Sequence, residues 1–273
     1  MKKILIIGSK GFIGSNLLAF FKKKNMNIHA VSFDSFLKKN ISFINVFDFI
    51  INCSTNKKFI LNKYKRINDN DLIVAEKITN NETKLISLST RKVYKTMFNI
   101  KEDDKLLPTC NYSKNKLTSE KLVQEILINR SLILRVANLI GLPTNNKRKL
   151  HKTFIDIFFR KIKQGYIYNN KKNYKDFISI RIFNEIVLKL IRKNAYGIYN
   201  ISLGQKVYLN QLTKWLNFYN KKKVIIIKGK KNFFSDNFTL NNLKLVHKIK
   251  IKYNLIDLKN DSLEISKKFF IKK

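Results

Sequence analysis

Short apolar runs alternate with stretches of helical spacing through the first half of this chain, and this order constrains the fold more than any other feature. Strands that are apolar without alternation are typical of a parallel sheet covered by helices on both faces. The sequence therefore predicts an α/β fold built from strand–helix–strand units. The gap between the second and third runs is short, so we expect an abbreviated crossover there. The apolar runs lie at 3–8, 28–33, 47–54, 84–89 and 131–141, and the helical stretches include 12–24, 58–80 and 112–128.

The pattern changes after Gly141 and Pro143, where shorter helical and apolar segments follow. No internal repeat or low-complexity linker separates them. We expect a main domain over residues 1–143 and a smaller α/β portion over 144–273 that binds the substrate. This smaller portion is expected to pack on the main domain and to contribute a strand or helix back to the main sheet.

Cysteines and histidines are few in the 273 residues. There are two cysteines, Cys53 and Cys110, and three scattered histidines. These residues cannot build a disulfide scaffold and show no metal-ligand spacing, so we expect no metal site. No apolar stretch is long enough to span a membrane, and the first apolar run is too short for a secretory signal. We therefore expect a cytoplasmic protein.

The chain carries a formal net charge of +38, from 56 Lys and Arg against 18 Asp and Glu. Such a charge ordinarily indicates nucleic acid or another polyanion as a partner. Here the lysines are spread along the whole chain and accompany many Asn, Ile and Phe, with only 8 Gly and 2 Pro. We interpret the charge as a compositional bias and expect no nucleic-acid partner, although a basic surface attracts phosphorylated substrates.

A glycine triplet joins the first apolar run to the first helical stretch. The segment GSKGFIG places Gly8, Gly11 and Gly14 there, and Phe12 and Ile13 precede the last glycine. The first glycine allows a tight turn, the second lets the backbone approach a pyrophosphate at the helix N-terminus, and the third allows close helix–strand packing. The spacing is GxxGxxG rather than GxGxxG. In this context the loop predicts a dinucleotide cofactor, NAD or NADP, bound to a Rossmann-type doubly wound sheet.

The choice between these cofactors depends on the residue after the second strand. An acidic residue about 20 positions beyond the loop bonds the adenine ribose and selects NAD. Asp34 lies at that distance, but Ser32 is the alternative for the same position. Ser32, with Lys38 and Lys39 nearby, tolerates the additional phosphate of NADP. Both cofactors therefore stay open.

Tyr112 and Lys116 stand one helical turn apart in the segment PTCNYSKNKLTSE. Residues four positions apart share one face of a helix, so both side chains can point into one cleft. A neighbouring ammonium favours the phenolate and lowers the pKa of a tyrosine, which makes the tyrosine a better base. Thr90 ends the predicted strand KLISLST, at the edge where open α/β sheets bind their ligands. From there Thr90 can bond a substrate hydroxyl that Tyr112 deprotonates.

In their order along the chain these motifs resemble the extended short-chain dehydrogenase/reductase family, which comprises NAD-dependent nucleotide-sugar epimerases, dehydratases and reductases. GSKGFIGSNL resembles the cofactor loop of that family, and INCST at 51–55 resembles the strand end beside the cofactor. The other matching segments are ISLSTRKVYK, PTCNYSKNKLTSE, LRVANLIGLP, KDFISI and GIYNISLG. The last of them ends at Gly204, and the remainder of the chain matches only loosely.

The resemblance implies a mechanism for the predicted site. Tyr112 would remove or return the proton of a sugar hydroxyl while a hydride passes to or from the nicotinamide. Thr90 would orient that hydroxyl. Lys116 would lower the pKa of Tyr112 and bond the nicotinamide ribose, and Asn68 would correspond to the asparagine that supports this lysine.

The resemblance also implies the surroundings of that site. Cys53 and Ser54 would lie against the cofactor, and Asn138 would contact the nucleotide-diphosphate sugar. The family further implies a homodimer that packs the helix of Tyr112 and a neighbouring helix against their symmetry mates. The expected role is surface-polysaccharide synthesis.

Departures from the family pattern narrow the reaction. Arg91 and Lys92 stand where sugar 4,6-dehydratases carry an acidic pair, which disfavours water elimination. A 4-epimerase and a 4-keto-sugar reductase both stay open. The alternatives from other classes are a non-catalytic NAD(P)-binding protein of the same fold and a nucleic-acid-binding protein.

Overall fold

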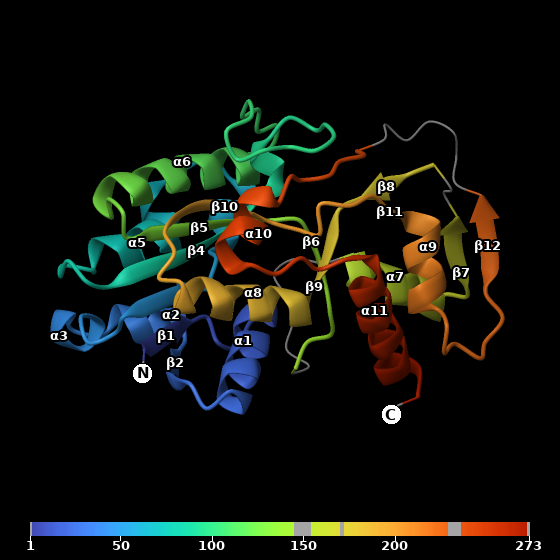
Figure 1. The fold of residues 1–273 in the computed structure, drawn as a ribbon, viewed down its shortest axis with the longest axis horizontal. Coiled ribbons are helices and arrows are strands. Elements are labelled where there is room, and N and C mark those ends of the chain that lie inside the picture. Colours follow the sequence, from blue (N-terminus) through green and yellow to red (C-terminus); the bar gives the residue numbers. More distant parts are fainter. Residues whose placement is uncertain (1, 145–153, 170–171, 229–235, 272–273) are drawn as a thin grey trace.

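The computed structural model describes residues 2–144, 154–169, 172–228 and 236–271, and a six-stranded sheet forms its centre (Figure 1). Every pairing in this sheet is parallel, and helices cover both of its faces. This confirms the predicted Rossmann-type doubly wound fold. The strands follow the order β10-β5-β4-β3-β1-β2. They are β1 (Lys3–Ile7), β2 (Asn27–Val31), β3 (Phe49–Asn52), β4 (Lys84–Thr90), β5 (Ser131–Val136) and β10 (Gly197–Ile201).

Alternate residues of each strand point into two separate hydrophobic cores, one on each side of the sheet. Ile4 and Ile6 face the core that contains Leu17, whereas Leu5 and Ile7 face the core that contains Val74. All four strand residues are fully buried, which explains why the strands read as continuous apolar runs. The first core is covered by α1 (Phe12–Lys23) and α8 (Ile180–Arg192), and the second by α2 (Phe33–Leu37), α3 (Ile41–Ile44), α5 (Asn70–Glu76) and α6 (Asn111–Ile126).

The two short helices α2 and α3 confirm the abbreviated crossover between the second and third strands. Two other expectations are wrong. The stretch 58–80 is not one helix, because α4 (Lys57–Leu61) ends at Asn62 in an extended conformation and Asp69 caps a new helix, α5, with its side chain. A short 3₁₀ helix, η1 (Arg66–Asn68), lies between them. This break brings the first turn of α5 under the end of the sheet.

The apolar run 131–141 is also not one strand. Strand β5 ends at Val136, and the chain continues as β6 (Asn138–Ile140), which leaves the main sheet to pair with β9 (Phe177–Ser179). The Ala137 N–H bonds the carbonyl of Ile201 at the turning point. Strand β5 is buried along its whole length and β6 is half-buried, and most residues of both are apolar, so the sequence pattern does not reveal the change of partner strand.

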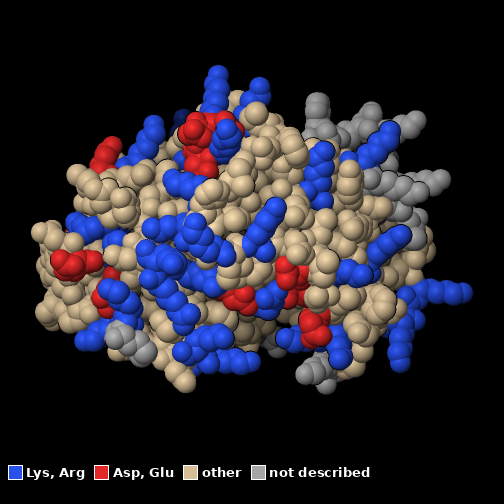
Figure 2. Space-filling model, viewed as in Figure 1, with Lys and Arg blue, Asp and Glu red and all other residues tan. Residues whose placement is uncertain are grey.

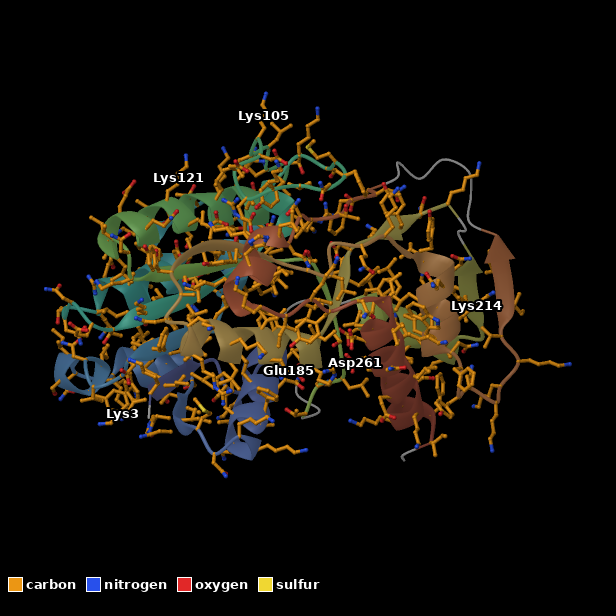
Figure 3. The ribbon with its side chains drawn as sticks, viewed as in Figure 1. Lys3, Lys105, Lys121, Glu185, Lys214 and Asp261 are labelled. Carbon is orange, nitrogen blue, oxygen red and sulfur yellow. The ribbon has the colours of Figure 1, made fainter. Side chains whose placement is uncertain are left out.

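The remaining elements lie mainly beside the sheet, on the right of Figure 1. Arg181 of α8 ties them to the main body through Asp261 of α11, at 2.6 Å, and Figure 3 shows Asp261 and Glu185 in this region. Lys105, Lys121 and Lys214, in contrast, lie at the periphery. The elements are η2 (Arg91–Val93), α7 (Phe154–Lys163), β7 (Tyr166–Asn169), β8 (Tyr174–Lys175), β11 (Val207–Tyr208), α9 (Leu209–Leu216), β12 (Ile225–Lys228), α10 (Leu243–Ile249) and α11 (Leu255–Phe270).

On the face of the molecule that Figure 2 shows, the basic charge is distributed rather than gathered in one patch. Figure 2 shows Lys and Arg side chains scattered over the whole visible face, with a few Asp and Glu among them. Among the described helices, none has the length and apolarity needed to cross a membrane.

Candidate active site

The glycine loop connects β1 to α1 at the point where the strand order of the sheet reverses. Strand β1 lies between β2 and β3, so the loop stands at the topological switch point of the sheet, where open α/β sheets bind ligands in a crevice at the strand ends. Gly8 has a φ of +77°, and a Cβ on Gly8 would come within 2.8 Å of the Ser54 nitrogen. A Cβ on Gly14 would overlap the carbonyl oxygen of Gly8. Only glycine therefore fits at these two positions, and the loop stays tight against the end of β3.

The loop also suits a phosphate group. Gly11 is the N-cap of α1 and supplies no capping side chain, so the positive end of the helix dipole points toward the crevice. Gly11 is exposed, and Phe12 and Ile13 begin the helix as half-buried residues. The predicted loop residues therefore lie together at one end of the sheet, in a geometry that accommodates a dinucleotide pyrophosphate.

Cys53 and Ser54 follow β3 directly and lie against Gly8. The Cys53 N–H bonds the carbonyl of Ile7, which extends the β1–β3 pairing by one residue. The side-chain oxygen of Asn52 accepts hydrogen bonds from the Ser54 N–H, at 3.0 Å, and from the Ser54 hydroxyl, at 2.6 Å. These bonds hold the end of β3 in a fixed turn beside the glycine loop.

The end of β2 places Ser32, rather than Asp34, next to the loop. Strand β2 ends at Val31, whose carbonyl accepts the Gly8 N–H, and Ser32 follows as the N-cap of α2. Asp34 lies in the first turn of α2 with an exposed side chain. Of the two alternatives, Ser32 has the position closer to the crevice.

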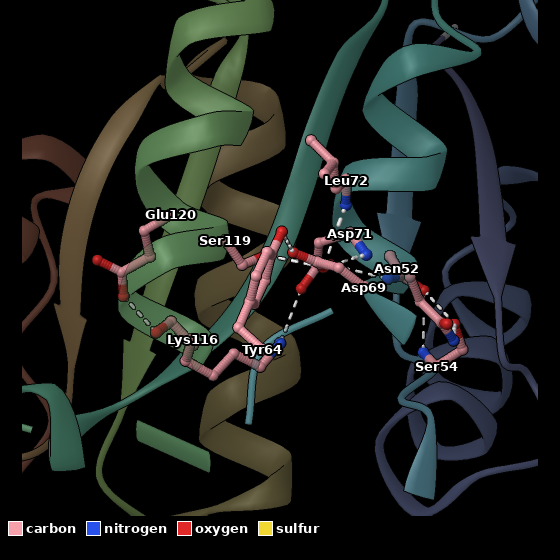
Figure 4. Close-up of polar contacts among 11 residues, drawn as sticks. Asn52, Ser54, Tyr64, Asp69, Asp71, Leu72, Lys116, Ser119 and Glu120 are labelled. Carbon is pink, nitrogen blue, oxygen red and sulfur yellow. Dashed lines mark hydrogen bonds and ion pairs between the residues drawn. The ribbon is translucent and has the colours of Figure 1, made fainter. Parts of the chain in front are cut away.

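Tyr112 and Lys116 lie on the first turns of α6, which packs over β4. Their spacing of four residues puts both on one face, as the sequence indicates. The Lys116 ammonium is buried, with 6% of its side chain exposed, and it lies 2.7 Å from the Asp71 carboxylate of α5. Figure 4 shows Asp71 between this lysine and the end of β3. Asp71 could not be predicted as a site residue from the sequence, because its burial depends on the break between α4 and α5.

Asn68 does not contact Lys116 in the way that the resemblance implies. Its side-chain oxygen accepts a hydrogen bond from Asn56 at 3.4 Å. Asp71, three residues further on, bonds the lysine instead. The expectation for Asn68 is wrong, because η1 ends at Asn68 and the chain then turns to direct Asp71 toward α6.

The pKa values of the pair depart from the simple expectation. Burial raises the pKa of Tyr112 above its ordinary value, Lys116 pulls it down, and Asp71 and Cys110 push it up again. The net pKa of Tyr112 is raised. For Lys116, burial is the largest single effect and lowers the pKa, but Asp71, Tyr112 and Asp69 together raise it by more, so this ammonium stays charged. Lys116 lowers the pKa of Tyr112, as expected, but burial and the Asp71 charge raise that pKa by more.

Thr90 ends β4 and caps η2, where its hydroxyl accepts the Lys92 N–H at 3.3 Å. The next residue, Arg91, is buried and forms an ion pair with Asp236, which also binds Lys175 at 2.9 Å. Phe238 lies under the guanidinium at 4.0 Å from the ring centre. The basic residue that replaces the dehydratase acid is thus held by a carboxylate from the far end of the chain.

Asn138 begins β6 beside the same end of the sheet. Its side-chain nitrogen is buried and has no hydrogen-bond partner within the described part of the chain, which leaves a donor for a ligand. The neighbouring strand β9 is preceded by Asp176, a buried carboxylate that accepts the N–H groups of Leu203, Gly204 and Leu240. Burial raises the pKa of Asp176 to about 7 although these N–H groups pull it down. Asp176 therefore organises the loops around Asn138.

The predicted catalytic residues Thr90, Tyr112 and Lys116 thus come from the end of β4 and the start of α6, and α6 packs against η2, the turn that Thr90 begins. Asn52 at the end of β3, beside the glycine loop, donates a hydrogen bond to Asp71, and Asp71 in turn bonds Lys116. The cofactor side of the sheet is therefore connected to the predicted catalytic residues. No cluster that could hold a metal ion occurs among the described residues. Fold and site together define the class of the protein as a dinucleotide-binding enzyme with a tyrosine–lysine pair.

Comparison with known proteins gives the family. The model of the NAD dependent epimerase/dehydratase family matches residues 4–202, and the chain belongs to this family. It is accordingly an NAD(P)-dependent enzyme of the extended short-chain dehydrogenase/reductase type, as the sequence motifs predict. None of the curated proteins matches the sequence significantly.

Solved structures share the fold over the full chain. One is a UDP-N-acetylglucosamine 4-epimerase from Methanobrevibacter ruminantium in complex with UDP-N-acetylmuramic acid, with 19% identity, 98% of both chains covered and a TM-score of 0.75. Another is a UDP-glucose 4-epimerase from Thermotoga maritima with UDP-glucose, with 17% identity, 98% and 99% covered and a TM-score of 0.73. A third is RMD from Pseudomonas aeruginosa complexed with NADPH, with 14% identity, 97% and 98% covered and a TM-score of 0.74.

Proposed function

We propose that this protein is an NAD(P)-dependent nucleotide-sugar 4-epimerase or 4-keto-sugar reductase. The observation that carries the proposal is the placement of Tyr112 and Lys116 on one face of α6, beside the end of β4 that carries Thr90. A non-catalytic binding protein has no need of a buried, charged lysine beside a tyrosine. The epimerases among the similar structures support the sugar-nucleotide class.

The glycine loop supports NAD or NADP as the cofactor. The backbone of Cys53 and Ser54 packs tightly against Gly8, and the N-cap of α1 is the exposed Gly11. This arrangement fits a pyrophosphate group at the N-terminus of the helix. When bound, the nicotinamide takes up a hydride from the sugar carbon or returns it. Cys53 and Ser54 would line the crevice on the side of β3, and Lys116 has further N–H donors for the ribose because its bond to Asp71 uses one of three.

The chain's own residues would move the proton. Tyr112 would take the proton of a sugar hydroxyl in the oxidising direction and return it in the reducing direction. Thr90 would orient that hydroxyl, because its oxygen already accepts the Lys92 N–H and its own hydrogen is left for donation. The Asn138 amide would donate to the nucleotide sugar from the opposite wall.

Arg91 argues against dehydration. Water elimination needs a group that gives a proton to the leaving hydroxyl, and this position holds instead a guanidinium that is ion-paired with Asp236. The two remaining reactions differ in their use of cofactor. An epimerase regenerates its cofactor in every cycle, whereas a reductase consumes one reduced cofactor for each product.

A panel of UDP-, dTDP- and GDP-sugars, incubated with and without NADPH, tests the proposal. Net consumption of NADPH indicates a reductase, and interconversion of two sugars with catalytic cofactor indicates an epimerase. Cofactor binding without turnover of any sugar would support a non-catalytic protein. Tight DNA binding that falls steeply with salt, without cofactor binding, would support the nucleic-acid alternative.

The assembly and the cellular role extend this proposal. We expect a homodimer that packs α6 and a neighbouring helix against their symmetry mates, and light scattering tests this. A cytoplasmic role in surface-polysaccharide synthesis fits an enzyme of nucleotide sugars, and loss of surface polysaccharide on deletion of the gene would support it.

A further inference from the structure

The carboxylate of Asp71 bridges the catalytic helix and the cofactor side of the sheet. One oxygen lies 2.7 Å from the Lys116 nitrogen, and the other accepts a hydrogen bond from the side-chain nitrogen of Asn52 at 2.8 Å. Asn52 in turn holds the turn at Ser54, which lies against Gly8. One continuous chain of contacts therefore runs from the glycine loop to Lys116 (Figure 4).

The bridge is closed off from bulk water. The side chains of Lys116 and Asp71 are only 6% and 5% exposed. The cavity beside them has a volume of about 10 Å³ and is lined by both residues and by Ser87, whose buried hydroxyl has no partner within the described residues. A cavity of this size holds about one water molecule. At most a single water could therefore take the place of the carboxylate if Asp71 is removed, and a water carries no charge to hold the ammonium.

Without Asp71, the side chain of Lys116 would adopt several conformations. A lysine side chain is flexible, and its ammonium is a point charge without the fixed geometry of a guanidinium. The ring of Phe59 lies 5.4 Å from the Lys116 nitrogen on another side, and Asp71 supplies the hydrogen-bonded contact that sets the direction. Burying two charges costs free energy unless each is hydrogen-bonded. A conformation in which the Lys116 ammonium leaves Asp71 is therefore unfavourable, and the ammonium is held in one position.

We propose that Asp71 is the positioning residue of this enzyme: it holds the Lys116 ammonium beside Tyr112 and joins the catalytic helix to the end of β3. The proposal rests on the proposed function, since it assigns Lys116 a part in the reaction. Asp71 touches neither sugar nor cofactor in this role. It acts through Lys116 and through the turn at Ser54.

The charges around Tyr112 make the role measurable. Three groups act on it: Lys116 from its own helix, Asp71 from α5, and Cys110 from the residue that caps α6. Asp71 opposes the effect of Lys116, because it raises the pKa of the phenol that Lys116 lowers. Removal of the Asp71 charge should therefore lower the pKa of Tyr112 even as it loosens the lysine.

The test is an ultraviolet difference titration of Tyr112, with Tyr112→Phe as the blank, together with turnover of the sugar found by the panel. In Asp71→Asn the midpoint of phenolate formation should fall by about one pH unit, and turnover should fall roughly tenfold to a hundredfold because Lys116 is less well placed. Asp71→Ser, which leaves room for a water, should shift the midpoint in the same direction. Asp71→Glu should return the midpoint toward that of the unaltered protein.

Asp69 supplies the matched control. It is buried, lies two residues away, and accepts hydrogen bonds from Ser119 and Tyr64 rather than from Lys116. Asp69→Asn should leave the midpoint of Tyr112 within about 0.3 pH unit, because the charges that act on Tyr112 are those of Lys116, Asp71 and Cys110. A general loss of structure would affect the Asp69 and Asp71 variants alike.

The lost charge lowers the midpoint and a loosened lysine raises it, so the turnover decides: unchanged turnover in both Asp71→Asn and Asp71→Ser would overturn the proposal, and so would an Asp71→Glu protein that behaves like Asp71→Asn. The titration needs no sugar. If no nucleotide sugar is turned over but the midpoint still falls, the proposed function fails while the positioning of Lys116 by Asp71 stands. If turnover is found and neither the turnover nor the midpoint changes in the Asp71 variants, the positioning role fails while the proposed function stands.

Discussion

Glu120 and Arg135 form a buried ion pair at 2.6 Å, one helical turn beyond Lys116, and their side chains are 4% and 2% exposed. The Glu120 carboxylate also accepts the Ser89 hydroxyl, next to Thr90 in β4. On the other side, the Arg135 guanidinium bonds the hydroxyl of Tyr94 at 2.9 Å. The pair therefore fastens α6, the helix of the tyrosine–lysine pair, to β4 and β5.

Removal of one partner of this pair should destabilise the fold strongly. Glu120→Gln leaves the Arg135 charge buried without a counter-charge, which should lower the free energy of unfolding by about 3–5 kcal/mol. Chemical denaturation monitored by circular dichroism measures this. The matched control is Glu76→Gln at the exposed Arg66–Glu76 pair, where the loss should stay below about 1 kcal/mol. Equal losses at the two pairs would contradict the structural role of Glu120.

Ser32 and Asp34 should differ in their effect on cofactor choice. Ser32 directly follows β2 beside the loop, and Asp34 is exposed in the first turn of α2. Ser32→Asp places a negative charge at the expected adenine ribose and should shift preference away from NADPH and toward NADH by about tenfold or more, equivalent to about 1.4 kcal/mol. Asp34→Asn should change the preference by less than about threefold, because its charge is screened by solvent. The ratio of dissociation constants, from cofactor fluorescence, decides between the two positions, and a larger effect at Asp34 would reverse this assignment.

The two cysteines should react at different rates with a thiol reagent. Burial raises the pKa of Cys110, but hydrogen bonds with Ser113 and the charge of Lys92 lower it by more, so its net pKa lies below the ordinary value. Cys53 is partly buried, and burial together with the charge of Asp71 raises its pKa. Iodoacetamide should label Cys110 at least about tenfold faster than Cys53, because the thiolate is the reactive form. Mass spectrometry of Cys110→Ser protein measures the remaining site, and rapid labelling of Cys53 there would show that the end of β3 is open to solvent.

The fold could be predicted from the sequence because its strands are buried on both faces and its loop glycines are rare. Gly8 and Gly14 stand where a Cβ would meet backbone atoms, so their requirement is local and visible in the sequence. The partners within the site could not be predicted in the same way. Asp71 reaches Lys116 only because the chain breaks after α4 and restarts with the Asp69 cap. Asn52 and Asp71 are 19 residues apart, and no periodicity connects them.

The change from β5 to β6 shows a second limit of the sequence. Val136 before Ala137 and Ile140 after it are both apolar and buried, so the apolar pattern alone does not show whether the strand continues or leaves the sheet. The change of partner to β9 is decided by distant residues, among them Asp176, whose carbonyl accepts the Asn138 N–H at 3.2 Å. Tertiary contacts of this kind override local pattern.

Turnover should rise with pH through neutrality in the direction that needs Tyr112 as a base. Its pKa is raised, mainly by burial, so the phenolate fraction grows as the pH increases toward that pKa. In this range the rate should increase by about tenfold for each pH unit, if proton transfer limits it. A pH–rate profile of kcat tests this, and a profile that falls above neutral pH would place the essential base elsewhere.

The central claim, that Tyr112 transfers the proton, is tested most directly by the Tyr112→Phe protein. This variant removes one hydroxyl and keeps the ring, so the fold and the glycine loop should be unaffected. With a sugar that the panel identifies, kcat should fall by about a hundredfold to ten-thousandfold, the contribution of a general acid–base group. The dissociation constant of the cofactor should stay within about threefold, a difference below about 1 kcal/mol. A Tyr112→Phe protein with full turnover would show that another group moves the proton.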